Sequence, residues 1–165
     1  MKNLLKQLSS LILPITVLVI VPWAIENRWV VTVDILSVAG FMLVAGGGAL
    51  LVGTVALLIR KGSGTLAPWS PTQKLVVRGL YAHTRNPMIT GVLTVLLGES
   101  AVFHSMPVFI WCVSFFVINN VYFVFSEEPG LEKRFGEEYR EYKKNVPRWL
   151  PRVRAWVPPN TPPSS

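Results

Sequence analysis

Three short polar segments of the sequence contain the side chains best suited to chemistry. They run from 73 to 81, from 83 to 87 and from 127 to 129, and the last two each border a long apolar stretch. The guanidinium group of Arg85 could hold a carboxylate or phosphate through its planar fork. Charges held at such a boundary are costly and are usually functional. We expect Arg85 and the acidic pair Glu127 and Glu128 to meet in a site there.

The same charges also have simpler explanations. Arg85 could mark membrane topology or extend its head group into water. Glu127 and Glu128 could be a solvated pair that opens a helix, where the helix dipole favours acids. Glu99 lies near the outer end of the third apolar stretch. A functional role is one alternative, but we rather expect it to reach the membrane surface or to hydrogen-bond to another helix.

Metal and disulfide chemistry find little support in the sequence. The two histidines, His83 and His104, do not have a metal-binding spacing. The single cysteine, Cys112, lies in an apolar block, so neither a disulfide framework nor a cysteine metal site can be built from it.

The elements that must position these residues are membrane helices. The chain has 165 residues, 51% of them hydrophobic, and the apolar residues form blocks too long for one-sided burial. We predict four transmembrane helices at about 8–25, 35–59, 88–103 and 108–125, because only helices satisfy their backbone in lipid. The first could instead be a signal peptide, but no convincing small-residue cleavage site follows it, and we prefer a retained span.

The basic residues predict how the chain crosses the membrane. All of the 16 Lys and Arg residues except Arg28 fall before the first span, between the second and third, or after the fourth. These segments should therefore be cytoplasmic, with both termini inside. The net charge of +7 then reflects topology and contact with anionic headgroups rather than binding to nucleic acid.

The remaining segments complete an all-α bundle in a single domain, 1–157. We predict a cytosolic amphipathic helix at 127–145, with Leu131, Phe135, Tyr139 and Tyr142 on one face. It should lie on the membrane surface or on the cytosolic helix ends. Residues 158–165 should be disordered. The glycines at 46–48 and 53 suit close helix packing, with a cofactor role as the alternative.

Two strings of residues carry a family resemblance. Gly79-Leu80-Tyr81-Ala82-His83-Thr84-Arg85-Asn86-Pro87-Met88 resembles the G-x-Y-x-x-x-R-[HN]-P motif of a membrane methyltransferase superfamily. The superfamily includes isoprenylcysteine carboxyl methyltransferases and phospholipid methyltransferases. The stretch from Glu127 to Arg148 resembles its E-E-x-x-L-x-x-x-F-G-x-x-Y-x-x-Y-x-x-x-V-P-R string. The resemblance covers roughly residues 65 to 152, with a helical hairpin between the two strings.

The resemblance implies methyl transfer from S-adenosylmethionine in a pocket at the cytosolic helix ends. It implies Arg85 and Glu128 as the catalytic pair, with Arg85 helping to order the site. The residues that it implies for cofactor binding are Gln73, Lys74, Leu75, Val76, Tyr81, Asn86, Pro87, Met88, Ile89 and Glu127.

Departures from the family pattern bear on the acceptor. Asn86 stands where many members have His, Ile89 where an aromatic is usual, and no arginine precedes the acidic pair. We expect a lipid-linked or amphipathic acceptor, with a prenylcysteine-type carboxylate first and a phospholipid or small amphipathic amine second. A non-catalytic scaffold that retains the fold is a further alternative. A transporter is disfavoured because the spans show no internal repeat.

Overall fold

A computed structural model describes residues 12–61, 75 and 77–158, and this part of the chain is helical without strands. A first helical segment, Ile12–Ile25, contains the π-helical turn η1 (Thr16–Ile20) and α2 (Val21–Ile25). The elements that follow are α3 (Ile35–Lys61), the 3-10 turn η2 (Gly79–Ala82), α4 (Pro87–Val102), α5 (Met106–Tyr122), the π-helical turn η3 (Phe123–Glu127), α6 (Glu128–Phe135) and α7 (Glu137–Asn145).

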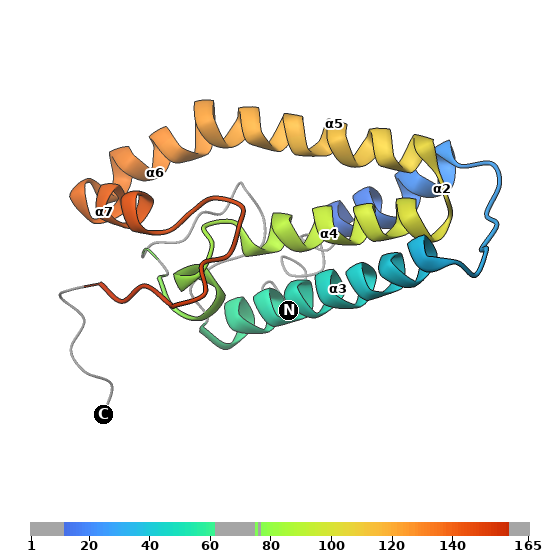
Figure 1. Cartoon of the computed structure of the whole chain (residues 1–165). Helices are drawn as coiled ribbons and strands as arrows, with labels where there is room; N and C mark the ends of the chain where they lie inside the picture. Colours follow the sequence, from blue (N-terminus) through green and yellow to red (C-terminus); the bar gives the residue numbers. More distant parts are fainter. Residues whose placement is uncertain (1–11, 62–74, 76, 159–165) are drawn as a thin grey trace, which may run out of the picture.

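The long helices lie side by side in alternating directions, with α4 between α3 and α5 (Figure 1). At one end, which we call the hairpin end, lie residues 26–34 and the turn at 103–105 between α4 and α5. At the other, which we call the C-terminal end, lie η2, α7 and residues 146–158. The hairpin predicted between the last two apolar blocks is therefore confirmed.

Two helices in the described part of the chain are long and apolar enough to cross a membrane. They are Ile35–Leu57, within α3, and the continuous helix Met106–Phe135, which joins α5, η3 and α6. Two shorter apolar helices, Ile12–Ile25 and Pro87–Val102, lie beside them. The predicted blocks agree with these helices to within a few residues, although the last helix continues ten residues beyond its predicted end. The number of spans remains a prediction.

Glycines bring α3 and α4 into close contact. A Cβ atom added to Gly40 would lie 2.7 Å from the carbonyl oxygen of Gly98, and one added to Gly47 would lie 2.8 Å from that of Gly91. The two pairs are spaced alike along the antiparallel helices, so the backbones meet at both levels. Gly46 and Gly48 have no neighbouring atom within 4 Å of such a Cβ. The predicted packing role therefore holds for Gly47 in the run.

The predicted helix at 127–145 is divided at Gly136, which is a correction to the sequence analysis. Gly136 has φ 56°, a left-handed value that L side chains rarely adopt. The chain therefore turns between α6 and α7, and α7 folds back at the C-terminal end (Figure 1). On α7, Tyr139 and Tyr142 are buried while the charged neighbours are exposed.

Candidate active site at the C-terminal end

Arg85 and Glu128 form an ion pair at the C-terminal end of the bundle. Nη1 of Arg85 lies 2.7 Å from Oε1 of Glu128, and the two side chains are only 11% and 6% exposed. Arg85 directly precedes the start of α4, where Pro87 takes the first helical position as expected. Glu128 begins α6, just after the π-helical turn η3. The predicted meeting of these clusters across the hairpin is confirmed.

Two further cations hold the same carboxylate. Arg148 donates from Nε to Oε1 of Glu128 at 2.7 Å, and Nζ of Lys143 lies 3.0 Å from Oε2. Both oxygens of Glu128 are therefore neutralised by basic groups. A buried carboxylate needs such partners, because an unpaired charge away from water is costly.

The backbone after α7 positions Arg148. The N–H of Arg85 donates to the carbonyl of Pro147 at 2.9 Å, and that of Arg152 donates to the carbonyl of His83 at 3.0 Å. Further along the same two segments, the N–H of Trp156 donates to the carbonyl of Ala82 at 3.0 Å. Residues 147–156 thus run antiparallel to residues 82–85 and close over the start of α4.

Two buried tyrosines of α7, which we call the tyrosine cluster, pack beside these two paired segments. Tyr139 and Tyr142 pack with Val77 and Val146, and the hydroxyl of Tyr142 donates to the carbonyl of Tyr81 at 2.7 Å. Burial raises the pKa of Tyr139 to about 12 and that of Tyr81 also to about 12. The nearby charge of Glu127 contributes to the raised pKa of Tyr81 after burial.

The other described residues that were predicted to bind the cofactor are divided between the start of α4, the tyrosine cluster and the bundle core. Asn86 is the last residue before α4, and its carbonyl accepts from the N–H of Thr90. Leu75 packs on the tyrosine cluster, whereas Ile89 packs on the bundle core with Val92 and Leu96. Pro87 is buried and Met88 half-buried. Gln73, Lys74 and Val76 lie outside the described residues.

Arg148, Lys143 and Asn120 belong to this site, although the sequence alone does not indicate them as site residues. Asn120 on α5 accepts from Nη1 of Arg148 at 2.9 Å, so it fixes the guanidinium from the opposite side. The sequence signal for Arg148 is its place in Val146-Pro147-Arg148, the end of the second string, to which the resemblance assigns no role.

A model of the phospholipid methyltransferase family matches residues 35–138, more than half of the chain. The chain belongs to this family. The family is part of the same superfamily of membrane methyltransferases that the two strings resemble. An uncharacterized protein of Haemophilus influenzae is 33% identical over 63 residues, which are 38% of this chain and all of that protein. No solved structure matches the chain.

Membership of the phospholipid methyltransferase family and the two long apolar helices identify a membrane protein with a methyltransferase fold. The match runs from the first residue of α3 into α7 and includes Arg85, Glu127 and Glu128. Arg148 lies beyond it. Among the described residues, no group of three or more His, Cys, Asp or Glu side chains is placed to hold a metal ion.

Two polar groups at this site, the guanidinium of Arg85 and the carboxyl of Glu127, suit a zwitterionic ligand. Nε of Arg85 is a buried donor that has no hydrogen-bond partner within the described residues. No ion pair joins Glu127 to a described basic residue, although it adjoins the cluster around Glu128. An anionic group at Arg85 and an ammonium group at Glu127 would satisfy both. The amino-acid end of S-adenosylmethionine carries that pair of charges.

Proposed function

We propose that this chain is an S-adenosylmethionine-dependent methyltransferase that acts on a lipid-linked or amphipathic acceptor at the cytosolic membrane face. The family match supports methyl transfer, and the unpartnered Nε of Arg85 is the observation that carries the choice of methyl donor. Carboxylate recognition by arginine is strong and directional, so a buried, unpartnered guanidinium nitrogen suits an anionic ligand group.

In this proposal, Arg85 holds the carboxylate of the donor and Glu127 holds its ammonium group. Tyr81, the turn from Asn86 to Ile89, and residues 73–76 line the rest of the pocket, as the resemblance implies. Glu128 acts as a positioning residue, since it fixes Arg85 through their 2.7 Å contact. When bound, S-adenosylmethionine supplies an electrophilic methyl group on a sulfonium.

The chain contributes orientation rather than strong acid or base chemistry. Correct positioning of two reactants can supply about 7 to 11 kcal/mol of the barrier. Trp149, the residue after Arg148, helps to hold this segment in place, because its ring centroid lies 5.1 Å from that of Phe116 and 5.7 Å from that of Phe123.

We rank an amine acceptor, such as a phospholipid headgroup, above a prenylcysteine-type carboxylate. A carboxylate acceptor needs a cation beside it. In this proposal Arg85 holds the donor, and the other two described cations around the centre, Arg148 and Lys143, are bound to Glu128. An amine acceptor needs no such partner, but its ammonium form must first lose a proton, which water at the cytosolic face can accept, to become a nucleophile. The family description also names phospholipids.

The proposed membrane arrangement has four spans and cytoplasmic termini, with the C-terminal end of the bundle in the cytosol. The excess of basic residues at this end supports that orientation. A water-soluble donor would enter from the cytosol, whereas a lipid-tailed acceptor would enter sideways from the bilayer. Residues 159–165 lie outside the described residues, and the disordered tail at 158–165 stays a prediction.

The test begins with the purified protein in a neutral detergent. S-adenosylmethionine is titrated by calorimetry against wild type, Glu127→Ala and Arg85→Ala, with Glu132→Ala as an exposed acidic control. Wild type and the control should bind, and the two site variants should bind at least tenfold more weakly. The proposal fails if wild type does not bind, or if both site variants bind like wild type.

The acceptor is identified with donor labelled on its methyl group. Phosphatidylethanolamine and a farnesylcysteine are offered separately, and labelled lipid is measured by mass spectrometry. Label in the phospholipid supports the amine acceptor, and label in the farnesylcysteine reverses the ranking. Binding without transfer to either compound or to a total lipid extract favours the non-catalytic scaffold.

A further inference from the structure

A pocket of about 330 Å³ lies at the hairpin end, away from the Arg85–Glu128 pair. It is lined by Leu18, Val19, Trp23, Trp29, Glu99 and Phe103. Glu99 lies 12 residues beyond Pro87 on α4, which places it about 18 Å along the helix from the candidate active site. Its occupant would therefore be separate from the reacting groups proposed above.

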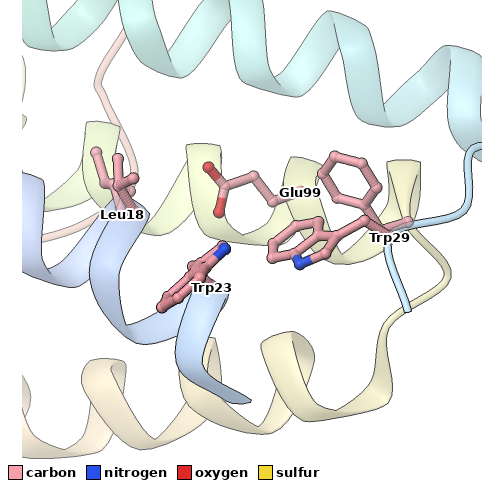
Figure 2. A pocket seen from close by; sticks show the side chains of 6 residues that line it. Leu18, Trp23, Trp29 and Glu99 are labelled. Atoms are coloured by element: carbon pink, nitrogen blue, oxygen red, sulfur yellow. The ribbon is translucent and has the colours of Figure 1, made fainter. Parts of the chain in front are cut away.

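Glu99 is the single ionisable side chain among the described residues that line this pocket. Its carboxyl group points into the pocket, on the side of Leu18 and Trp23 (Figure 2). The Oε2 atom is buried and has no hydrogen-bond partner within the described residues, so the expected interhelical hydrogen bond is not found there. A carboxylate left alone in apolar surroundings is costly, and it gains most from a bound cation.

The remaining lining suits a cation that carries apolar substituents. Trp29 and Phe103 meet edge to face with ring centroids 4.6 Å apart, and Trp23 provides a third ring. Aromatic faces attract organic ammonium groups, and an acidic partner reinforces that attraction. The hairpin end is also acidic, since Glu26 and Asp34 accompany one basic residue, Arg28, in residues 26–34.

The mouth of the pocket indicates an amphiphile rather than a small ion. Trp23 is 72% exposed and Val19 is 59% exposed, and both lie on the first helix beside the pocket. A hydrocarbon chain attached to the ammonium group could follow these side chains outward. We propose that this pocket binds the ammonium group of an amphiphilic cation against Glu99 and the tryptophan rings, as a second site distinct from the methyl-transfer site.

The test measures binding by calorimetry to the full chain in a maltoside detergent. The probes are octyltrimethylammonium, octylamine, the head-only cation tetramethylammonium and neutral octyl glucoside. We expect both octyl cations to bind and octyl glucoside not to. Glu99→Gln should weaken cation binding about tenfold, because it removes the charge and keeps the shape. Trp23→Leu, at an exposed position, should also weaken it.

Two controls make the outcome decisive. Glu26→Gln removes an acid at the same end that does not line the pocket, and it should weaken cation binding far less than Glu99→Gln does. Glu99→Gln should bind S-adenosylmethionine like wild type, so the result is independent of the proposed function. The site is overturned if Glu99→Gln binds octyltrimethylammonium unchanged, if Glu26→Gln weakens binding equally, or if octyl glucoside binds as well. Equal binding of tetramethylammonium would instead overturn the amphiphile and indicate a free cation.

Discussion

Arg148 donates from Nε to Oε1 of Glu128 at 2.7 Å, and its Nη2 atom lies 2.6 Å from the same oxygen. This contact joins the segment after the last helix to the end of the long apolar helix. Because Arg85 reaches the same oxygen, one carboxylate fixes two arginines from distant parts of the sequence. The stability of the fold and the geometry of the candidate site therefore depend on the same group.

Replacing Glu128 with Gln should destabilise the protein strongly. The change leaves the guanidinium groups of Arg85 and Arg148 in a buried setting without their anion, at a cost of about 3 to 5 kcal/mol. The thermal midpoint of unfolding in detergent measures this loss. Glu132→Gln provides the control, because its ion pair with Arg140 is exposed and should contribute little. Equal midpoints for the two variants would contradict a buried, structural pair.

Replacing Arg148 with Ala should weaken binding of S-adenosylmethionine about tenfold, although Arg148 is not placed against the donor. Arg148 bridges Glu128 and Asn120, and its loss frees the Glu128 carboxylate that orients Arg85. Arg148→Lys should recover part of the affinity, since it keeps the charge but not the fork. The comparison variant is Arg152→Ala, whose side chain donates to the carbonyl of the exposed Asn145 and makes no ion pair with Glu128. Weaker binding in Arg152→Ala, with unchanged binding in Arg148→Ala, would contradict the positioning role of Arg148.

The sequence predicted the frame of the site but not its full set of residues. Uninterrupted apolar blocks and Pro87 were enough to place α4 and α5, and the hairpin between them then required Arg85 and Glu128 to lie at one end. The position of Arg148 at the site depends on the backbone hydrogen bonds between residues 82–85 and 147–156. No local pattern encodes such a pairing, because it involves main-chain groups that every residue has.

The glycines also differ in whether their role can be predicted from the neighbouring sequence or depends on the tertiary structure. The run at 46–48 indicated close packing, but the face that α3 turns toward α4 depends on the tertiary structure, which selects Gly47. Gly136 is a local signal for the end of a helix, but the apolar periodicity predicts one continuous helix across it. The spacing of Phe135, Tyr139 and Tyr142 continues across it as in one helix, while its φ of 56° ends α6.

Gly47→Leu should destabilise the bundle by at least about 2 kcal/mol. Its Cβ would lie 2.8 Å from a backbone oxygen of α4, so the helices would have to move apart. Gly46→Leu is the matched control, because no atom lies within 4 Å of its Cβ and the change should be tolerated. Thermal unfolding in detergent compares the two. A larger loss in Gly46→Leu would mean that the helix faces are assigned wrongly.

Asp34→Ala should lower the thermal midpoint more than Asp34→Asn does. Asp34 caps α3 by accepting from the N–H of Ser37 at 2.8 Å, a bond that an Asn oxygen can also accept. The backbone bond to Ser37 also lowers the pKa of Asp34. The shared loss in both variants reports the contact of Oδ2 of Asp34 with Nε2 of His104, and the difference between them reports the cap. Equal midpoints for the two variants would exclude a capping role.

The buried tyrosines predict a loss of stability at alkaline pH. Burial raises the pKa of Tyr81 and of Tyr139 to about 12, whereas both would ionise near the ordinary value of 10 in the unfolded chain. The folded state thus keeps protons that the unfolded state loses, so their contribution to stability is complete below pH 10 and disappears as the pH rises toward 12. Absorbance at 295 nm follows ionisation, and denaturant midpoints at each pH follow stability. Tyr139→Phe should reduce the slope of stability against pH above pH 10, and an unchanged slope in both Tyr139→Phe and Tyr81→Phe would contradict the assignment.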